Sequence, residues 1–180
     1  MGDPEIREKY DATAGSYDSI YKAEQFEKYM VALSKIRPRG VVLDAGCGTG
    51  LFAEYLAPLG YFESAIDLYI CLDYSWGMLE IAAKRLSRVC PGKCVVVQGD
   101  IESIPLSDAS VDLAYSFTVV DLAVSKEKAL AELDRVTRRG FVVSFLKKLP
   151  YKDAFLGRLK YLGASSKDVI LYKPKTLVRS

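Results

Sequence analysis

Short apolar runs alternate with amphipathic segments along the chain. Runs rich in Val and Ile predict buried strands, whereas apolar residues three or four positions apart predict helices that bury one face. The predicted strands cover residues 41–45, 67–73, 94–98, 111–117, 141–145 and 168–172, and the predicted helices cover 21–36, 51–59, 76–88, 126–139 and 152–162. This alternation predicts an α/β fold in which helices cover both faces of a mostly parallel sheet.

A length of 180 residues favours a single domain. Within it we expect a helical N-terminal arm in residues 1–36, a ligand-binding core in 37–148 and a basic C-terminal helix and strand in 149–180. No apolar run approaches the ~20 residues that cross a bilayer, and the N-terminus is polar and acidic. The sequence therefore predicts a cytoplasmic protein that makes no membrane contact.

The first predicted strand ends in a glycine-rich turn. Residues 41–50 read VVLDAGCGTG, with Gly46, Gly48 and Gly50 at alternating positions. Glycines leave the backbone bare, so a ligand can lie directly against it. The helix that follows would point its first N–H groups at the same ligand. A strand, a glycine turn and a helix start together predict a nucleotide-type binding site.

An aspartate stands at or near the end of each of the first three strands, namely Asp44, Asp73 and Asp100. Aspartate is common in loops and caps, which explains each one singly. Next to a glycine turn, however, an acid after the second strand is placed to accept hydrogen bonds from ribose hydroxyls. An acid after the third strand suits the exocyclic amine of adenine, and Asp44 suits a cationic ammonium.

Four segments together resemble the motifs of the class I S-adenosylmethionine-dependent methyltransferases. They are LDAGCGTG at 43–50, LDYSWGML at 72–79, GDIESIPL at 99–106 and VDLAYS at 111–116. The resemblance covers about residues 5–148. It implies a three-layer, Rossmann-like methyltransferase fold with six or seven strands, and S-adenosylmethionine as the cofactor.

The resemblance also implies which residues hold that cofactor. Its methionine part would lie on the glycine turn with Asp44 near the amino group, and Asp73 would hold the ribose hydroxyls. Tyr74 and Met78 would border the adenine. The implied set is Tyr10, Tyr17, Asp44, Ala45, Gly46, Cys47, Gly48, Gly50, Asp73, Tyr74, Met78, Asp100, Ile101, Ser116 and Phe117.

In this set, Asp100 and the Ile101 N–H would read the adenine edge, and Ser116 and Phe117 would flank the sulfonium and the methyl acceptor. Residues 10–18 resemble a lid segment of the family, so Tyr10 and Tyr17 would cover the cofactor. The alternative for both tyrosines is ordinary packing of an N-terminal arm.

The chain contains no histidine, which removes imidazole bases and histidine-ligated metals. Methyl transfer from a sulfonium needs mainly alignment, which can be worth roughly 7–11 kcal/mol. A base is required only if the acceptor must lose a proton, and Asp121 and Tyr17 are the candidates. Asp121 fits equally well as a cap for the helix that starts near Ser125.

The four cysteines, Cys47, Cys71, Cys90 and Cys94, are expected to be reduced thiols. A zinc site at Cys90 and Cys94 is disfavoured because zinc needs four ligands, so no metal is expected. A dehydrogenase is disfavoured because Leu51 stands where its fingerprint requires a third glycine.

The charge is unevenly distributed. Residues 1–134 carry 13 basic and 21 acidic side chains, and residues 135–180 carry 12 basic and 2 acidic ones. A basic C-terminal region favours RNA, or a translation-associated protein, as the methyl acceptor. Its alternative is a solvated surface. The simple architecture favours a small metabolite instead, and a non-catalytic binding subunit with this fold is the third possibility.

The third predicted strand would form an edge of the sheet, and its sequence Cys94-Val95-Val96-Val97 is apolar. An exposed apolar edge must be covered. Some members of the resembled family pair there with a small zinc-binding activator protein that adds a strand. The resemblance therefore implies such a partner, unless helices of the chain itself cover the edge.

Overall fold

A computed structural model describes residues 4–149 and 157–175. Seven strands form one sheet in the order β3-β2-β1-β4-β5-β7-β6. Their bounds are β1 Gly40–Ala45, β2 Ile66–Asp73, β3 Cys94–Gln98, β4 Leu113–Phe117, β5 Gly140–Leu146, β6 Lys160–Ala164 and β7 Asp168–Pro174. Strands β1 to β5 are parallel, whereas β7 runs antiparallel to β5 and to β6. The predicted mostly parallel sheet is confirmed.

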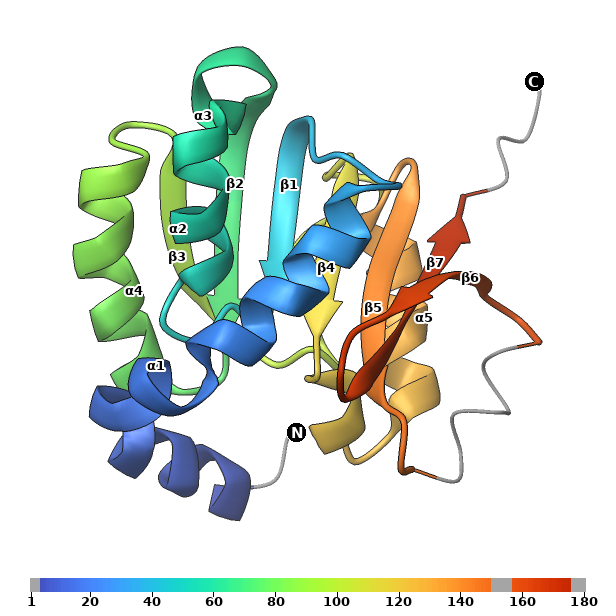
Figure 1. The fold of residues 1–180 in the computed structure, drawn as a ribbon, viewed down its shortest axis with the longest axis horizontal. Helices are drawn as coiled ribbons and strands as arrows, with labels where there is room; N and C mark the ends of the chain where they lie inside the picture. Colours follow the sequence, from blue (N-terminus) through green and yellow to red (C-terminus); the bar gives the residue numbers. More distant parts are fainter. Residues whose placement is uncertain (1–3, 150–156, 176–180) are drawn as a thin grey trace.

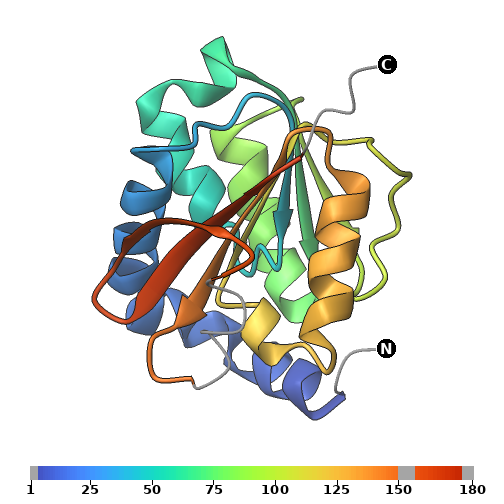
Figure 2. The same ribbon diagram turned by 90° about the vertical axis from the view of Figure 1, so that its right-hand side faces the viewer.

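Helices cover both faces of this sheet (Figures 1 and 2). The helices are α1 Pro4–Leu33, α2 Leu51–Leu56, α3 Tyr61–Ser64, α4 Trp76–Val89 and α5 Lys126–Val136, with short 3₁₀ turns at Ala57–Leu59 (η1) and Val120–Leu122 (η2). Helices α1, α2 and α4 share one apolar core with the sheet, and α5 shares another with the opposite face. The chain is therefore the three-layer α/β structure that the sequence predicts.

Alternate residues of each central strand enter opposite cores, as the two-residue period of a strand requires. On β1, Val42 belongs to the core under α1 and α2, whereas Leu43 belongs to the core under α5. Because both faces are covered, these strands are apolar almost throughout. This burial fixes the register and hence the place where each strand ends.

The N-terminal helix is longer than the sequence pattern predicts. The apolar spacing indicates a helix over residues 21–36, but α1 runs unbroken from Pro4 to Leu33. Most side chains of its first half are exposed or half-buried and polar, so they show no amphipathic period. Its N-terminal half crosses below the carboxyl ends of the strands (Figure 1).

The prediction of a helix over residues 152–162 is wrong for the last residues of that range. Residues 160–164 form the edge strand β6, which pairs with β7 from Lys160 opposite Tyr172. Hydrogen bonds to a distant strand decide this conformation, and local apolar spacing does not report them. The part of that prediction in residues 150–156 lies outside the described residues.

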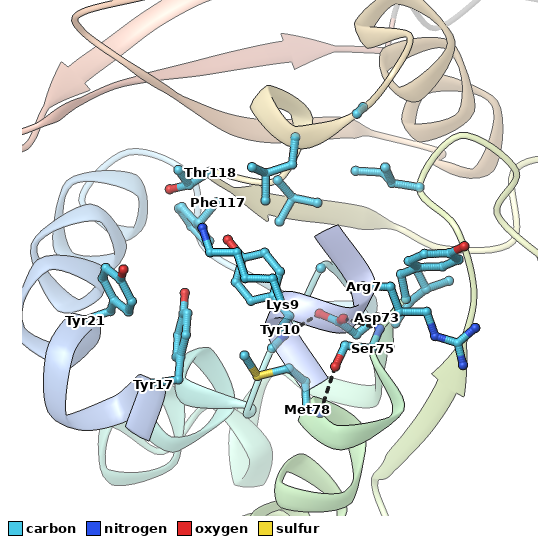
Figure 3. A pocket seen from close by; sticks show the side chains of 18 of the residues that line it. Arg7, Lys9, Tyr10, Tyr17, Tyr21, Asp73, Ser75, Met78, Phe117 and Thr118 are labelled. Atoms are coloured by element: carbon cyan, nitrogen blue, oxygen red, sulfur yellow. Dashed lines mark hydrogen bonds between the residues drawn. The ribbon is translucent and has the colours of Figure 1, made fainter. Parts of the chain in front are cut away.

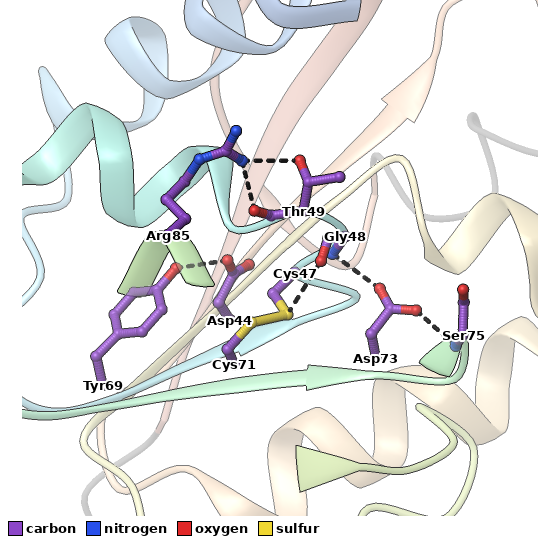
Figure 4. Close-up of a disulfide and its surroundings, with 9 residues drawn as sticks. All are labelled: Asp44, Cys47, Gly48, Thr49, Tyr69, Cys71, Asp73, Ser75 and Arg85. Atoms are coloured by element: carbon purple, nitrogen blue, oxygen red, sulfur yellow. Dashed lines mark hydrogen bonds between the residues drawn. A yellow bond between two sulfur atoms is a disulfide. The ribbon is translucent and has the colours of Figure 1, made fainter. Parts of the chain in front are cut away.

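The expectation of reduced thiols is also wrong, because the structure pairs Cys47 with Cys71 and Cys90 with Cys94. Strand register brings the first pair together. Asp44 lies beside Cys71 in the β1–β2 ladder, and the turn after β1 folds back over β2. The Cys47–Cys71 disulfide therefore ties the glycine turn to the second strand (Figure 4).

Reduction should destabilise the fold. The Cys47–Cys71 bond joins residues 24 apart in sequence. Closing a loop of that length removes conformational entropy from the unfolded chain, which stabilises the folded state by about 3 kcal/mol. We expect the free energy of unfolding to fall by that order when dithiothreitol is added. The unreduced chain should show no reactive thiol in denaturant with Ellman's reagent, and four free thiols there would contradict the pairing.

Among residues 4–149 and 157–175, no helix is both long enough and apolar enough to cross a bilayer.

Candidate functional site

A cavity of about 500 Å³ lies at the carboxyl ends of the central strands, and residues from the N-terminal half of α1 help to line it. Ligands bind at this edge in open α/β sheets. In Figure 3, Phe117 and Thr118 lie at one end of the cavity and Asp73 and Ser75 at the other. Its walls come from α1, the glycine turn, the ends of β2 and β4, and the loops after β3 and β5.

The glycine turn forms the floor beside Asp73. The N–H groups of Gly46 and Cys47 both donate to the Leu72 carbonyl, at 2.7 and 3.0 Å. Gly46, Gly48 and Gly50 all have positive φ angles, between 54° and 81°. A Cβ on Gly46 would strike Val119, whereas a Cβ on Gly48 would stand in open space. Gly48 lines the cavity, so this open space is the cradle that a ligand would fill.

Replacing Gly48 with Ala should therefore weaken cofactor binding more than it weakens the fold. Gly92 offers a matched control, because it also has a positive φ angle (75°) and open space around its Cβ, in a turn away from the cavity. Each substitution should cost roughly 1–2 kcal/mol of stability. Only Gly48→Ala should raise the dissociation constant of S-adenosylhomocysteine, by about tenfold or more. Equal binding by the two variants would contradict the assigned cradle.

Asp73 both stabilises the glycine turn and lines the cavity. One carboxylate oxygen accepts the Gly48 N–H at 2.8 Å, and the other accepts the Ser75 N–H at 2.9 Å (Figure 4). Burial raises the pKa of Asp73 above its usual value, against the opposing effect of these hydrogen bonds. The Tyr74 N–H also bonds to this carboxylate. Because a carboxylate has about four lone-pair positions, it can still accept from a ribose hydroxyl.

Asp44 lies beneath the turn, 3% exposed. Its carboxylate accepts a 2.5 Å hydrogen bond from the Tyr69 hydroxyl (Figure 4). Burial raises the pKa of Asp44 to about 7, with Asp73 adding to the rise. Asp44 borders a second, smaller cavity of about 20 Å³ under the turn. A buried carboxylate of this kind favours a cation as its partner.

Gln25 on α1 reaches the same place, and the sequence pattern does not point to it. It lines both cavities and donates to the Tyr17 hydroxyl at 3.2 Å. Its buried carbonyl oxygen has no hydrogen-bond partner among the described residues. A buried acceptor without a donor costs stability unless a ligand supplies one. Gln25 and Asp44 together suit an ammonium group.

The opposite wall suits an adenine. Tyr74, Met78, Asp100 and Ile101 all line the large cavity, as the family resemblance implies. The Arg7 guanidinium lies 5.4 Å from the centre of the Tyr74 ring. An Asp100 carboxylate oxygen accepts the Glu102 N–H at 2.9 Å, which fixes the loop after β3.

Helix α1 acts as the cover of the site. Tyr10 and Tyr17 line the cavity, with ring centres 6.3 Å apart. The Asp11 carboxylate accepts hydrogen bonds from the Ser75 hydroxyl and the Gly77 N–H, and so caps the start of α4. The Thr49 hydroxyl donates to Asp18 at 2.6 Å. These bonds fasten the helix across the glycine turn.

The Arg85 guanidinium on α4 also links α1 to the glycine turn and to α2. It pairs with Asp18 of α1 and, at 2.6 Å, with Glu54 of α2, and it donates to the Thr49 carbonyl. The lid predicted for residues 10–18 is thus a stretch of helix. Its two tyrosines stand where the lid prediction places them.

Four residues of the predicted set do not line either cavity: Ala45, Gly50, Ser116 and Asp121. Ala45 is buried at the end of β1, and Gly50 precedes α2. Ser116 is buried and faces away from both cavities, and Asp121 accepts the Leu146 N–H at 2.9 Å. The cap that the sequence allows for Asp121 belongs to Ser125, which accepts the Lys128 N–H.

The roles of Asp121 and Tyr17 as bases stay predictions, and the structure shows the surroundings of each side chain. The bond from Leu146 holds Asp121 in the fold. Burial and the neighbouring Tyr10 raise the pKa of Tyr17 above its usual value, so its phenol keeps its proton at neutral pH. Within the described residues, no cluster of three metal-ligating side chains occurs.

The donor set fits S-adenosylmethionine. Gln25 and Asp44 suit its ammonium, the Gly48 cradle its methionine chain, Asp73 its ribose, and Tyr74 with Met78 its adenine. A sheet of this order with this site defines the class: a class I S-adenosylmethionine-dependent methyltransferase domain. The family model of the methyltransferase domain matches residues 43–145, and the chain belongs to this family.

Individual proteins agree with this assignment. A malonyl-[acyl-carrier protein] O-methyltransferase of Serratia marcescens is 34% identical over 141 residues, which are 78% of this chain and 51% of that protein. A SAM-dependent methyltransferase from Aquifex aeolicus superposes with a TM-score of 0.72 at 19% identity, over 92% of this chain and 98% of that chain.

The fold is also similar to a chain in the Haloferax volcanii complex between the Trm112 methyltransferase activator and a methyltransferase. The TM-score is 0.65 at 22% identity, over 75% of this chain and 59% of that chain. The chain spans about half the length of the curated relatives it matches.

Proposed function

We propose that the protein transfers the methyl group of S-adenosylmethionine to a carboxylate oxygen of a small acid, such as a malonyl group held as a thioester. The proposal rests on the lining of the cavity, because its two ends carry different kinds of side chain. Asp73 lines the half that suits the cofactor, and Lys148, on the loop after β5, lines the half beyond β4 in the sheet order. The malonyl O-methyltransferase relative supports a small acid over RNA or protein.

A carboxylate acceptor also removes the need for a general base. When bound, S-adenosylmethionine supplies an electrophilic methyl group and a neutral leaving group. An ionised carboxylate attacks without losing a proton, so neither Tyr17 nor Asp121 needs to remove one. The residues of this chain orient the two partners, and Tyr10, Tyr17 and Phe117 exclude water from the space between them.

The basic C-terminal region gives little support to an RNA acceptor. Arg135 pairs with Asp108 and Glu132, and Arg138 pairs with Asp112. Lys173 and Lys175 both pair with Asp134, and Lys167 pairs with Glu24. These cations neutralise acids contributed by the N-terminal 134 residues. They are not gathered into an unpaired patch that could release counterions from a phosphate backbone.

The direct test is an assay with labelled S-adenosylmethionine and malonyl-coenzyme A, with the product identified by mass spectrometry. The proposal predicts a methyl ester, and Gly48→Ala should reduce its rate. A non-catalytic binding subunit would bind the cofactor but form no ester from any carboxylate. Methylated RNA, with no ester formed, would overturn the proposal in favour of the RNA acceptor.

We propose as a separate point that a small activator protein adds a strand to β3. This strand is an edge that pairs only with β2 among the described residues, and Val95 on it is 43% exposed. The similarity to the Haloferax volcanii methyltransferase supports the idea through fold alone. A charge at this position, Val95→Lys, should abolish co-purification of such a protein from the native source. A chain that purifies as an active monomer would contradict the proposal.

A further inference from the structure

Lys28 is a fully buried cation on α1, behind the wall of the cavity. Its ammonium nitrogen lies 2.9 Å from Glu24, 2.8 Å from Asp168 on β7 and 2.7 Å from the Thr118 hydroxyl oxygen. The contacts with Glu24 and Thr118 are hydrogen bonds, whereas the contact with Asp168 is an ion pair. Two carboxylates neutralise the buried charge, as burial requires. The third contact leads directly to the cavity.

Thr118 stands at the end of β4 and lines the cavity next to Phe117 (Figure 3). Its φ angle is 63°, a conformation that β-branched residues rarely adopt. Such strain persists only where the surroundings impose it, and it is found mainly at functional sites. Here the Thr118 N–H donates to the Ser144 hydroxyl on β5 at 2.9 Å, and the side chain is held by Lys28.

The contact with Lys28 determines what the Thr118 hydroxyl can do. An ammonium only donates, so the Thr118 oxygen is the acceptor in that bond and its hydrogen must point elsewhere. Among the described residues, its other oxygen neighbour is the Ser144 hydroxyl at 3.5 Å, the limit of hydrogen-bond length. The hydrogen is therefore available to an acceptor atom in the cavity.

We propose that Thr118 is the acceptor-binding residue of this enzyme and that Lys28 is the positioning residue that orients it. Thr118 donates to one oxygen of the acceptor carboxylate and leaves the second oxygen free to attack the methyl group. This inference rests on the proposed function and deepens it. Lys148 and Lys167 line the same end of the cavity, and Lys167 pairs with Glu24.

The test uses two variants of Thr118. Thr118→Val keeps the β-branched shape and loses the hydroxyl, whereas Thr118→Ser keeps the hydroxyl. With protein saturated in S-adenosylhomocysteine, calorimetry should show malonyl-coenzyme A binding to Thr118→Val about 10- to 100-fold more weakly than to the wild type. Thr118→Ser should bind it within a few-fold of the wild type. In turnover, Thr118→Val should raise KM more than it lowers kcat.

S-adenosylhomocysteine affinity serves as the folding check and should be the same in all three proteins. The double variant Lys28→Met with Asp168→Asn removes the buried charge pair together. It should weaken malonyl-coenzyme A binding to the same degree as Thr118→Val. Wild-type affinity in Thr118→Val would overturn the role of Thr118, and wild-type affinity in the double variant would overturn the role of Lys28. A wild-type protein that neither binds nor methylates the thioester would overturn the proposed function itself, before any variant is compared.

Discussion

Replacing Asp44 with Asn should make the ligand-free protein more stable at pH 8, by up to about 4 kcal/mol. Burial raises the pKa of Asp44 to about 7, from its ordinary value of 3.8. Between those two pH values the folded protein keeps a proton that the unfolded chain has lost. The free energy of unfolding therefore falls as pH rises through this window, and the full cost is present above pH 7. The asparagine of the Asp44→Asn variant keeps a side-chain oxygen, so it can still accept the hydrogen bond from the Tyr69 hydroxyl.

Urea unfolding at pH 4 and pH 8 measures this effect. The gain from Asp44→Asn should be small at pH 4 and largest at pH 8. Asp67 supplies the control, because it lies on the adjacent strand with an exposed side chain. Asp67→Asn should change stability little at either pH. An Asp44→Asn variant that is equally stable or less stable at pH 8 would show that Asp44 is not a buried, destabilising charge.

The same variant should lose cofactor affinity, because the ammonium of the ligand needs the ionised carboxylate. For the wild type, the dissociation constant of S-adenosylhomocysteine should rise about tenfold for each pH unit below 7. Asp44→Asn should bind weakly and without this slope. An affinity that stays flat in the wild type between pH 5.5 and 8 would contradict a contact between Asp44 and the ligand.

The second large effect is expected from Asp73→Ala. It removes the acceptors for the Gly48 and Ser75 N–H groups and the site assigned to the ribose hydroxyls. Hydrogen bonds to a charged group are worth about 1.5–3 kcal/mol each, so losing the bond to the ribose should weaken binding by about tenfold or more. The unpaired N–H groups should lower stability by about 1–3 kcal/mol as well.

Asp73→Asn provides the graded comparison. It keeps one acceptor oxygen but sets an NH₂ group against one of the two backbone N–H groups. Its affinity should fall between those of the wild type and Asp73→Ala. Calorimetry with S-adenosylhomocysteine at pH 8 gives both values. Wild-type affinity in Asp73→Ala would remove the ribose assignment.

The cofactor half of the site could be predicted because its signals are local. A buried strand, a glycine turn and an acid at the next strand end are each visible within about ten residues, and the parallel sheet brings them together. Asp44, Gly48 and Asp73 lie where that logic places them. Ala45, Gly50 and Ser116 carry the same motifs, but the alternation of the strands and the course of the turn direct them away from the cavities.

The other features of the site could not be predicted in this way. Gln25 and Lys28 reach the site because α1 crosses the sheet, and Thr118 becomes notable only through its φ angle and its contact with Lys28. The Cys47–Cys71 pairing likewise depends on the β1–β2 register. These features depend on contacts between residues 24 to 140 positions apart, which no local pattern reports.

Calorimetry of the purified protein with S-adenosylmethionine at pH 8 tests the central claim most directly. The account predicts one binding site per chain, competition by S-adenosylhomocysteine, and loss of the signal in Asp73→Ala. A folded protein that takes up neither compound, judged by an unchanged melting temperature at millimolar ligand, would contradict the assignment of this cavity as a cofactor site.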